Sequence, residues 1–272
     1  MNKTTIPDIS VVIPCYNAGA YLQEAVDSVQ QYCRQHSYEI IVTNDGSTDE
    51  ATLLVLKDLA AKDCSILHQE NKGAAAARNA GVRASSGKYI FFLDSDDRVR
   101  EGCIDKGIAV LEANNETGVV YGKPHFFGET AKPRYITKAF DFNSLLFDNY
   151  IGCCAVIRRK VWDDVDGFDE AFVLTHEDWE FWIRVAVAGW KFHFIDEYLF
   201  DYRIVNGSRV SWSVEEERHR AMREYVFKKH LPLFIKQYRF FAVQYFIYKE
   251  DKQKPFRSFV KYVYNKYFKK GQ

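Results

Sequence analysis

Tyr89-Ile90-Phe91-Phe92-Leu93 runs directly into Asp94-Ser95-Asp96-Asp97. The unbroken apolar and aromatic run predicts a buried strand. Three carboxylates within four residues cannot all remain ionised side by side unless a cation or solvent compensates their charge. Ligands of open α/β sheets bind beyond the carboxyl ends of the strands, and hard divalent cations prefer carboxylate oxygens. We therefore expect a metal–diphosphate site at this strand end; an acidic turn that only caps a helix is the alternative.

Strand and helix patterns alternate through the first half of the chain, on both sides of this stretch. Apolar runs that end in Pro, Asn, Asp or Gly predict strands, and segments with helical spacing of apolar residues lie between them. Strands separated by single helices form βαβ units with a largely parallel, helix-covered sheet. The predicted strands are 9–13, 39–43, 65–68, 89–93 and 119–121, and the predicted helices are 20–32, 49–62, 73–84 and 101–112.

The pattern is less regular after residue 122. We expect a helix at 142–147, a strand at 152–157, a helix at 178–188 and a final strand at 191–195. Gly189 suits the left-handed position that commonly follows the end of a helix.

Polar residues follow the first two predicted strands. Tyr16, within Pro14-Cys15-Tyr16-Asn17, can stack on a base, and Asn17 can cap the following helix. Asp45, which begins the turn Asp45-Gly46-Ser47-Thr48-Asp49, can accept a hydrogen bond from the ring N–H of a uracil-type base. Ser47 to Asp49 resemble the start of a helix.

A third polar segment, Asn71-Lys72-Gly73-Ala74-Ala75-Ala76-Ala77-Arg78-Asn79, opens the next predicted helix. Its small residues allow a close approach of the backbone. Arg78, one turn into the helix, suits a phosphate or Asp45. Each of these signals is weak alone, but their placement on successive strand ends strongly indicates one ligand site.

The composition is that of an ordinary globular protein, with 47% hydrophobic and 27% charged residues. Residues 1–8 contain no apolar core of a signal peptide, and no apolar run approaches the ~18 residues that cross a bilayer. We therefore expect a cytoplasmic protein. The six cysteines have no metal-binding or CxxC spacing, which indicates reduced and mostly buried thiols; they are Cys15, Cys33, Cys64, Cys103, Cys153 and Cys154.

Positive charge is concentrated at the C-terminus. The formal net charge is zero, but residues 228–272 hold twelve Lys/Arg and two acidic residues. Apolar and aromatic residues at 256–268 follow the spacing of one helix face, with basic residues between them. We expect a basic, aromatic helical extension over 213–272 that lies on an anionic membrane surface. The alternative is that its aromatic face packs on the preceding domain; a basic patch alone is too unspecific to indicate nucleic acid, which we do not expect as a partner.

Five segments follow one another along the chain: VVIPCYNAGAYLQEAVDSV, EIIVTNDGSTDE, NKGAAAARNAGVRASSGKYIFFLDSDD, Asp166-Gly167-Phe168-Asp169-Glu170 and THEDWEFWIRVAVAG. Together they resemble a family 2 glycosyltransferase with the GT-A fold, over roughly residues 8–212. The resemblance implies a Rossmann-like, mostly parallel sheet flanked by helices. It also implies a glycosyltransferase domain at 1–212, in which 8–122 binds the nucleotide sugar and 123–212 binds the acceptor. Family members move a sugar from a nucleotide diphosphate donor to an acceptor hydroxyl with inversion, usually with Mn²⁺ or Mg²⁺.

The resemblance implies roles for the matching residues of the donor half. The nucleotide pocket would be lined by Pro14, Tyr16, Asn17, Asp45, Arg78, Asp94 and Ser95, with Asp45 reading the base. Asp94-Ser95-Asp96 matches the family's DxD motif: Asp96, with Asp97 beside it, would hold the metal, and Asp94 would contact the ribose or a metal-bound water. Arg203 would contact the diphosphate, because Val205 stands where many relatives carry a His in the same loop, Tyr202 to Ser208.

Glu177-Asp178 matches the family's acceptor-side ED motif, with Asp178 as the general base and Glu177 as its catalytic neighbour. The same residues resemble the start of a helix with Thr175 as cap and Asp178 as the third helical residue, a role compatible with catalysis. We expect His176 to make a local hydrogen bond. Trp179 and Trp182 are expected in the core or against the acceptor.

These observations predict a metal-dependent, inverting glycosyltransferase of the hexosyltransferase type. We expect a nucleotide-sugar donor, with UDP favoured, a glycan or lipid-linked glycan acceptor, and a role in bacterial surface polysaccharide (capsule or O-antigen) assembly on the inner face of the cytoplasmic membrane. Segments 121–138 and 140–150 are expected to shape acceptor choice.

The sequence is less consistent with three other classes of protein than with an inverting glycosyltransferase. A processive synthase is disfavoured because its Gln-x-x-Arg-Trp motif and transmembrane helices are missing. A NAD-dependent dehydrogenase is disfavoured because no GxGxxG follows the first predicted strand. The alternative outside the enzymes is a nucleotide-sugar-binding module without activity, against which Asp96, Asp97 and Asp178 argue.

Overall fold

The computed structural model describes residues 6–62, 64–129, 131, 133–172, 175–205 and 212–254. It divides into two compact units, 1–223 and 224–272. The division falls within helix α8 (Trp212–Lys229). The functional boundary after residue 212 stays a prediction. The predicted basic amphipathic helix at 256–268 lies outside the described residues.

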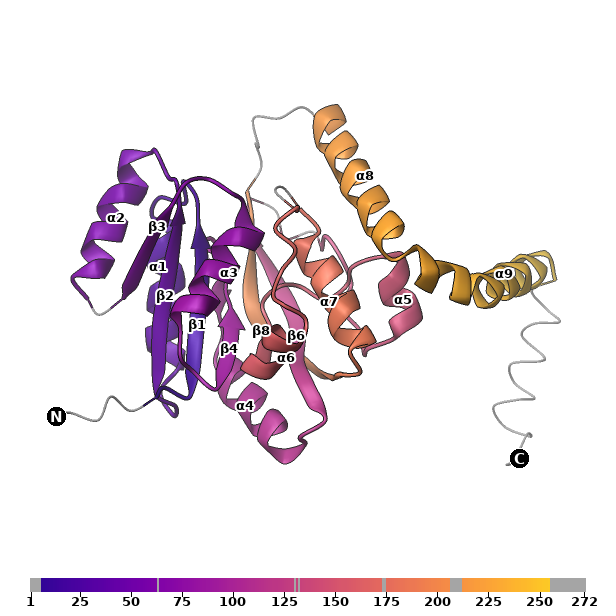
Figure 1. Cartoon of the computed structure of the whole chain (residues 1–272), viewed down its shortest axis with the longest axis horizontal. Coiled ribbons are helices and arrows are strands. Elements are labelled where there is room, and N and C mark those ends of the chain that lie inside the picture. Colours follow the sequence, from indigo (N-terminus) through magenta and orange to yellow (C-terminus); the bar gives the residue numbers. More distant parts are fainter. Residues whose placement is uncertain are drawn as a thin grey trace. The chain divides into compact units, whose positions relative to one another are not determined.

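Four parallel strands form one half of the sheet (Figure 1). They are β1 (Ile9–Cys15), β2 (Tyr38–Asp45), β3 (Ser65–Gln69) and β4 (Tyr89–Phe92). Their order is β3-β2-β1-β4, with parallel pairing throughout. The prediction of strand–helix alternation and of a parallel sheet is confirmed for this half.

The other half of the sheet is mixed. The order of the whole eight-stranded sheet is β3-β2-β1-β4-β7-β6-β8-β5, with β7 antiparallel to both β4 and β6, β6 parallel to β8, and β8 antiparallel to β5. The bounds are β5 (Arg98–Val99), β6 (Thr117–Gly128), β7 (Val156–Arg158) and β8 (Lys191–Ile204). The predicted strand at 152–157 starts later than expected, and β6 and β8 extend well beyond their predicted ends because they pair with each other along most of their length. β5 was not predicted.

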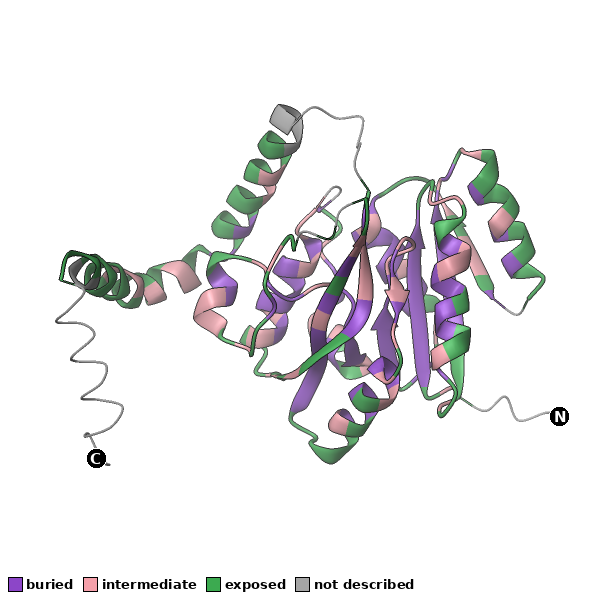
Figure 2. Ribbon diagram, turned by 180° about the vertical axis from the view of Figure 1, so that it is seen from behind, coloured by how far each residue is buried: buried purple, intermediate pink, exposed green. Residues whose placement is uncertain are grey.

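Helices cover both faces of the sheet. In Figure 1, α3 (Ala74–Ala84) and α7 (Glu177–Val187) lie in front of the strands, and in Figure 2, viewed from behind, α1 (Tyr21–Tyr32) and α4 (Cys103–Ala113) cover the opposite face. Three helices complete the first unit: α2 (Glu50–Ala60), α5 (Phe142–Phe147) and α6 (Arg159–Asp164). Of these, α6 was not predicted.

Alternation along β1 divides its side chains between the two layers of helices. Ile9, Val11 and Ile13 belong to the core that includes residues of α1 and α4, and all three are fully buried. Val12 points the other way, toward α3, where a Cβ on Gly81 would lie 2.5 Å from its side chain. Burial of each such side chain stabilises the fold by about 1.5–3 kcal/mol, and the glycine lets α3 approach the sheet closely.

The second unit is described from Glu224 to Lys254 and contains the end of α8 and helix α9 (Leu231–Gln253). Large apolar side chains of α9 are exposed, among them Ile235 (66%), Tyr238 (71%) and Phe246 (65%). None of the described helices has both the length and the apolar character that a bilayer crossing requires.

Candidate functional site

A cavity of about 300 Å³ lies beyond the carboxyl ends of β1, β2 and β4. The topology brings together three segments that are far apart in the sequence, because parallel neighbouring strands end at the same edge of the sheet. Its lining consists of Pro14, Cys15, Tyr16, Asp45, Ala74, Ala77, Arg78, Asp94, Ser95, Asp96 and Glu177. Eight of the residues that we singled out therefore line one cavity, and Tyr16 is 52% exposed there.

Asp45 anchors the segment that leads into α3. Its Oδ2 accepts the backbone N–H of Gly73 at 2.8 Å, and its Oδ1 accepts the N–H of Lys72 at 2.9 Å and the side-chain amide of Gln69 at 2.6 Å. Gly73 has φ of 88°, a conformation that favours glycine. Arg78 pairs with Asp94 and Glu177 rather than with Asp45; the other partner that we considered for Arg78, a phosphate, stays a prediction.

Asn17 joins two loops at the rim of the cavity. Its Oδ1 accepts the backbone N–H groups of Thr48 at 2.8 Å and of Asp49 at 3.2 Å. The prediction that Asn17 caps the following helix is wrong: the residue before α1 is Ala20, which offers no side-chain cap. Asn17 does not line the cavity and supports the loop on which Asp49 caps α2 through the N–H of Thr52.

Arg78 links the acidic loop after β4 to the start of α7. One guanidinium nitrogen lies 2.5 Å from Asp94 Oδ1 and another lies 2.6 Å from Glu177 Oε1. Arg78 is only 2% exposed, and its Nε has no hydrogen-bond partner within the described residues. A buried cation between two carboxylates holds the acidic loop and the start of α7 together, because separating it from either would leave an unpaired charge.

The acidic loop presents Asp94 and Asp96 to the cavity. Burial and the charge of Asp94 raise the pKa of Asp96 to about 6, which is the expected effect of crowding carboxylates. Among the described side chains, no group of three or more His, Cys, Asp or Glu could hold a metal ion. Two carboxylates beside an open cavity fit Mn²⁺ or Mg²⁺ that completes its coordination with phosphate and water.

Asp97 does not share this arrangement. It is 2% exposed, and its Oδ1 accepts the backbone N–H of Arg203 at 2.8 Å while its Oδ2 lies 3.7 Å from Cys154 Sγ. Burial, followed by the charges of Asp94 and Asp96, raises the pKa of Asp97 well above its ordinary value. Asp97 does not line the cavity, so the structure does not support it as a metal ligand; it ties the acidic loop to β8.

Arg203 also differs from its predicted role. Its Nε donates to the backbone oxygen of Asp96 at 2.8 Å, and a terminal nitrogen lies 2.6 Å from Glu24. The guanidinium carbon lies 4.3 Å from the ring centre of Tyr21 and 4.5 Å from that of Phe127. Arg203 lines neither this cavity nor the second cavity described next, so the structure does not support the predicted diphosphate contact. The side chain holds the acidic loop through the backbone of Asp96.

A second cavity, of about 210 Å³, adjoins the first and contains Asp178. Arg78, Asp94 and Glu177 line both cavities. The other residues lining the second cavity are Tyr135, Asn149, Ile151, Gly152, Cys153, Thr175, His176, Asp178 and Tyr202. Burial and the neighbouring charge of Glu177 raise the pKa of Asp178 to about 7, against the opposing charge of Arg78. A carboxyl that is half ionised near neutral pH suits a general base.

The start of α7 differs in detail from the prediction. Helix α7 begins at Glu177, so Asp178 is its second residue, and His176 rather than Thr175 precedes the helix, with φ of 67°. His176 Nε2 lies 3.1 Å from Nδ1 of His219, and burial, followed by the charge of His219, lowers the pKa of His176 to about 4. Trp179 and Trp182 are fully buried, so they belong to the core and not to the cavity wall.

Sequence reasoning missed the individual residues Asn149, Tyr135 and Cys153 of the second cavity. Asn149 and Tyr135 lie within the segments 121–138 and 140–150 that we expected to shape acceptor choice, but no local motif distinguishes them. All six cysteines are free and buried, as predicted. Cys153 lines the second cavity and Cys154 contacts Asp97; both come just before β7, which the fold pairs with β4.

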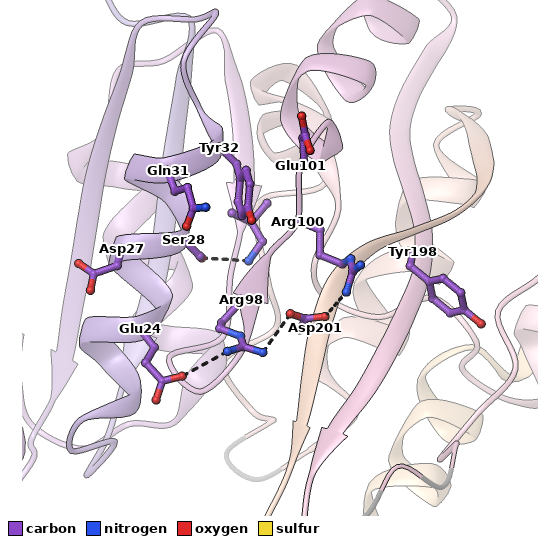
Figure 3. Close-up of a pocket in the computed structure, with 11 residues that line it drawn as sticks. Glu24, Asp27, Ser28, Gln31, Tyr32, Arg98, Arg100, Glu101, Tyr198 and Asp201 are labelled. Atoms are coloured by element: carbon purple, nitrogen blue, oxygen red, sulfur yellow. Dashed lines mark hydrogen bonds and ion pairs between the residues drawn. The ribbon is translucent and has the colours of Figure 1, made fainter.

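A larger cavity, of about 660 Å³, lies between α1, β5 and β8 (Figure 3). It shares no lining residue with the other two cavities. Four of its charged groups pair with one another: Asp201 accepts from Arg98 at 3.1 Å and from Arg100 at 2.7 Å, and Glu24 lies 3.6 Å from Arg98. Glu24 also accepts from Arg203, which holds the acidic loop. This ion-pair network therefore stabilises the acidic loop indirectly, and we assign the cavity no ligand.

The family models that match this chain and the similar curated proteins given below are all glycosyltransferases. Residues 10–166 match the family model described as Glycosyl transferase family 2, and residues 89–247 match Glycosyl transferase family group 2. An uncharacterized glycosyltransferase of Rickettsia prowazekii is 31% identical over 75% of this chain and 64% of its own length. One from Rickettsia conorii is 32% identical over 77% of this chain but only 35% of its own length, so the chain spans about one to two thirds of these relatives. The putative teichuronic acid biosynthesis glycosyltransferase TuaG of Bacillus subtilis is 27% identical over 80% of this chain and 88% of its length.

Among solved structures, S. aureus TarS 1–349 shares the fold. Its complex with UDP superposes with a TM-score of 0.61 and 19% identity, covering 72% of this chain and 60% of that one. The complex with UDP-GlcNAc gives a TM-score of 0.62 and 20% identity, covering 74% and 60%.

Proposed function

This chain belongs to glycosyl transferase family 2, and from that premise we propose that it transfers a sugar from a nucleotide diphosphate donor to an acceptor hydroxyl with inversion. One observation carries the proposal: the cavity at the strand ends and the cavity of Asp178 adjoin each other and share Arg78, Asp94 and Glu177. A donor in the first cavity would therefore expose its sugar toward a base in the second.

The nucleotide occupies the first cavity. Tyr16, half exposed at its rim, offers a ring on which a base can stack. Asp45 lines the same cavity and accepts a single hydrogen bond on Oδ2, which leaves that oxygen able to accept a ring N–H of uracil. The structural neighbours were solved with UDP and UDP-GlcNAc, which favours a UDP-sugar.

Asp94 and Asp96 would hold a divalent cation, Mn²⁺ or Mg²⁺, beside the diphosphate. When bound, such an ion acts as a Lewis acid that stabilises the charge of the departing phosphate. Arg78 holds Asp94 in place through its 2.5 Å contact, and Arg203 holds the backbone of Asp96. These residues fix the loop so that its carboxylates need not reorganise during the reaction.

Asp178 is the general base. The acceptor hydroxyl oxygen attacks the anomeric carbon, the bond from that carbon to the diphosphate breaks, and the hydroxyl proton passes to Asp178. Attack from the face opposite the leaving group inverts the anomeric centre, as in inverting glycoside hydrolysis with an alcohol in place of water. Proton removal by a positioned carboxylate contributes typically about 10²–10⁴-fold to the rate.

The experiment is calorimetric titration of the protein with UDP, GDP and dTDP, each with and without Mn²⁺, followed by transfer assays with sugars of the nucleotide that binds. We expect binding of one nucleotide that weakens strongly without metal. Asp178→Asn should bind that nucleotide normally but lose at least about 100-fold in transfer. Binding without transfer by the unaltered chain would favour a nucleotide-sugar-binding module, and no binding of any nucleotide would contradict the proposal.

The acceptor is a glycan or lipid-linked glycan of a bacterial surface polysaccharide, a proposal that the likeness to TuaG supports. We also propose that α9 binds a membrane surface. Its exposed apolar residues are accompanied by Lys236, Arg239, Lys249 and Lys252. A basic helix rich in exposed Tyr and Phe suits an anionic bilayer surface, where a lipid-linked acceptor would be presented.

Flotation with phosphatidylglycerol vesicles tests this surface. The variant Ile235→Ser/Tyr238→Ser/Phe246→Ser should lose flotation, whereas Leu53→Ser/Leu54→Ser, which alters exposed apolar residues of the first unit, should retain it. Equal flotation of both variants, or equal binding to vesicles of phosphatidylcholine alone, would contradict a role of α9 at anionic lipid.

A further inference from the structure

Helix α7 holds α5 and the segment that follows it by two indole hydrogen bonds. Trp179 Nε1 donates to the backbone oxygen of Leu145, and Trp182 Nε1 donates to that of Ile151 at 3.1 Å. Both tryptophans are fully buried. The segment between the two acceptors is therefore fastened to the helix that carries Asp178, and Asn149 lies within it.

The side-chain amide of Asn149 contacts Asp178 directly. Its Nδ2 donates to Asp178 Oδ2 at 2.9 Å. Its Oδ1 accepts the backbone N–H of Ile151 at 3.2 Å, and its own N–H donates to Asp148 at 3.0 Å. Because the amide oxygen is committed to a backbone donor, rotating the amide by 180° would lose both bonds, and the donor end must face the carboxylate.

Asp178 is thus held at both oxygens. Oδ1 accepts the backbone N–H of Trp179 at 2.7 Å, and Oδ2 accepts the Asn149 amide. A carboxylate oxygen can accept a second hydrogen bond, and Asp178 lines the second cavity together with Asn149.

We propose that Asn149 is a positioning residue that orients the Asp178 carboxylate toward the acceptor and favours its ionised form. The inference rests on the assignment of Asp178 as general base in the proposed function and goes beyond it, since no motif of the chain marks Asn149. A neutral donor favours the ionised carboxylate but lowers its pKa less than a cation at the same distance would. Glu177 cannot orient Asp178 in this way, because its own Oε1 is bound to Arg78.

The test measures the ionisation of Asp178 itself. The pH titration of the aspartate side chains is observed by ¹³C NMR in the whole chain labelled at aspartate, and the Asp178 signal is assigned by its loss in Asp178→Asn. The ionisable groups that face this carboxyl are Glu177, Arg78, Asp94, Cys153 and Tyr135. None of them is altered in Asn149→Ala, which removes only the donor. We expect the pKa of Asp178 to rise by about one unit in this variant, equivalent to an about tenfold change in the proton equilibrium.

Asn149→Asp sharpens the test, because it keeps the shape of the side chain and replaces the donor with a second carboxylate. The two acids would share a proton, and the pKa of Asp178 should rise further. Asn114→Asp is the matched control: it adds the same charge at an exposed turn where Oδ1 already accepts the N–H of Glu116. It should leave the titration of Asp178 unchanged.

Transfer kinetics give an independent readout. At pH 7 kcat should fall about fivefold in Asn149→Ala, because a rise of the Asp178 pKa from about 7 to about 8 lowers its ionised fraction from one half to about one tenth. The fall should be larger in Asn149→Asp, while KM for the donor stays unchanged and the acid limb of the pH profile moves to higher pH. An unchanged Asp178 titration in both variants would overturn the role of Asn149 even if the enzyme transfers sugar. Conversely, a chain that transfers no sugar would overturn the proposed function, and the NMR titration would still decide whether Asn149 controls Asp178.

Discussion

Replacing Arg78 with Met should destabilise the protein strongly, because it removes the cation between two carboxylates but keeps a side chain of similar length. The Arg78 side chain is 3% exposed, and those of Glu177 and Asp94 are 12% and 32% exposed. Removing one partner of a buried ion pair costs about 3–5 kcal/mol. Water screens Asp94 but hardly Glu177, so we expect the lower end of that range, about 3 kcal/mol.

The assay is thermal unfolding followed by tryptophan fluorescence, which Trp179 and Trp182 of α7 report from the core beside Glu177. For a chain of this size a loss of about 3 kcal/mol lowers Tm by about 6–12 °C. Arg83→Met is the matched control: Arg83 lies on the same helix, is 56% exposed and forms a 3.3 Å pair with Glu170. An exposed pair contributes only about 0–1 kcal/mol.

The pH dependence separates an ionic cause from a packing cause. In Arg78→Met the unpaired carboxylates are stabilised by protonation, so the loss of stability relative to the unaltered protein should shrink between pH 7.5 and pH 5. A cavity or strain caused by Met would not depend on pH. The reasoning is refuted if Arg78→Met and Arg83→Met unfold at the same temperature, or if the difference between them is as large at pH 5 as at pH 7.5.

Three further predictions follow from single contacts. The rate of transfer should fall about tenfold per pH unit below pH 7 and level off above it. The base must be ionised to accept a proton, and the pKa of Asp178 is raised to about 7. A constant rate between pH 5 and pH 9 would exclude Asp178 as the base. In urea unfolding, Gly46→Ala should lose more stability than Gly189→Ala. Both glycines have positive φ, but only at Gly46 would the new Cβ lie 2.9 Å from a backbone nitrogen, that of Asn71. Equal losses of stability would show that the contact at Gly46 relaxes freely. Tyr16→Ala should weaken nucleotide binding by about tenfold or more, as expected for a lost base–aromatic stack, whereas an unchanged calorimetric affinity would place the base elsewhere.

The half of the fold that contains β1 to β4 could be predicted from the sequence because its signals are local. Each of the first four strands is an apolar run ended by polar or turn residues, and each following helix has its own spacing, so β1 to β4 and α1 to α4 were found within a few residues of their ends. The mixed half of the sheet was less predictable. β8 and β6 continue past their apolar segments because they pair with each other along most of their length, and a pairing between distant segments leaves no mark within either one.

The sequence by itself determined which residues gather at the cavity, since parallel strands end at one edge and Tyr16, Asp45, Asp94 and Asp96 follow such strands. Only the tertiary structure decided which way each side chain turns. Asp97 faces inward because Arg203 and Cys154, more than fifty residues away, supply its hydrogen bonds. Asn149 reaches Asp178 because two tryptophans fasten its segment to α7. A strand end places a residue, but the partners that orient its side chain come from elements whose positions are set by packing alone.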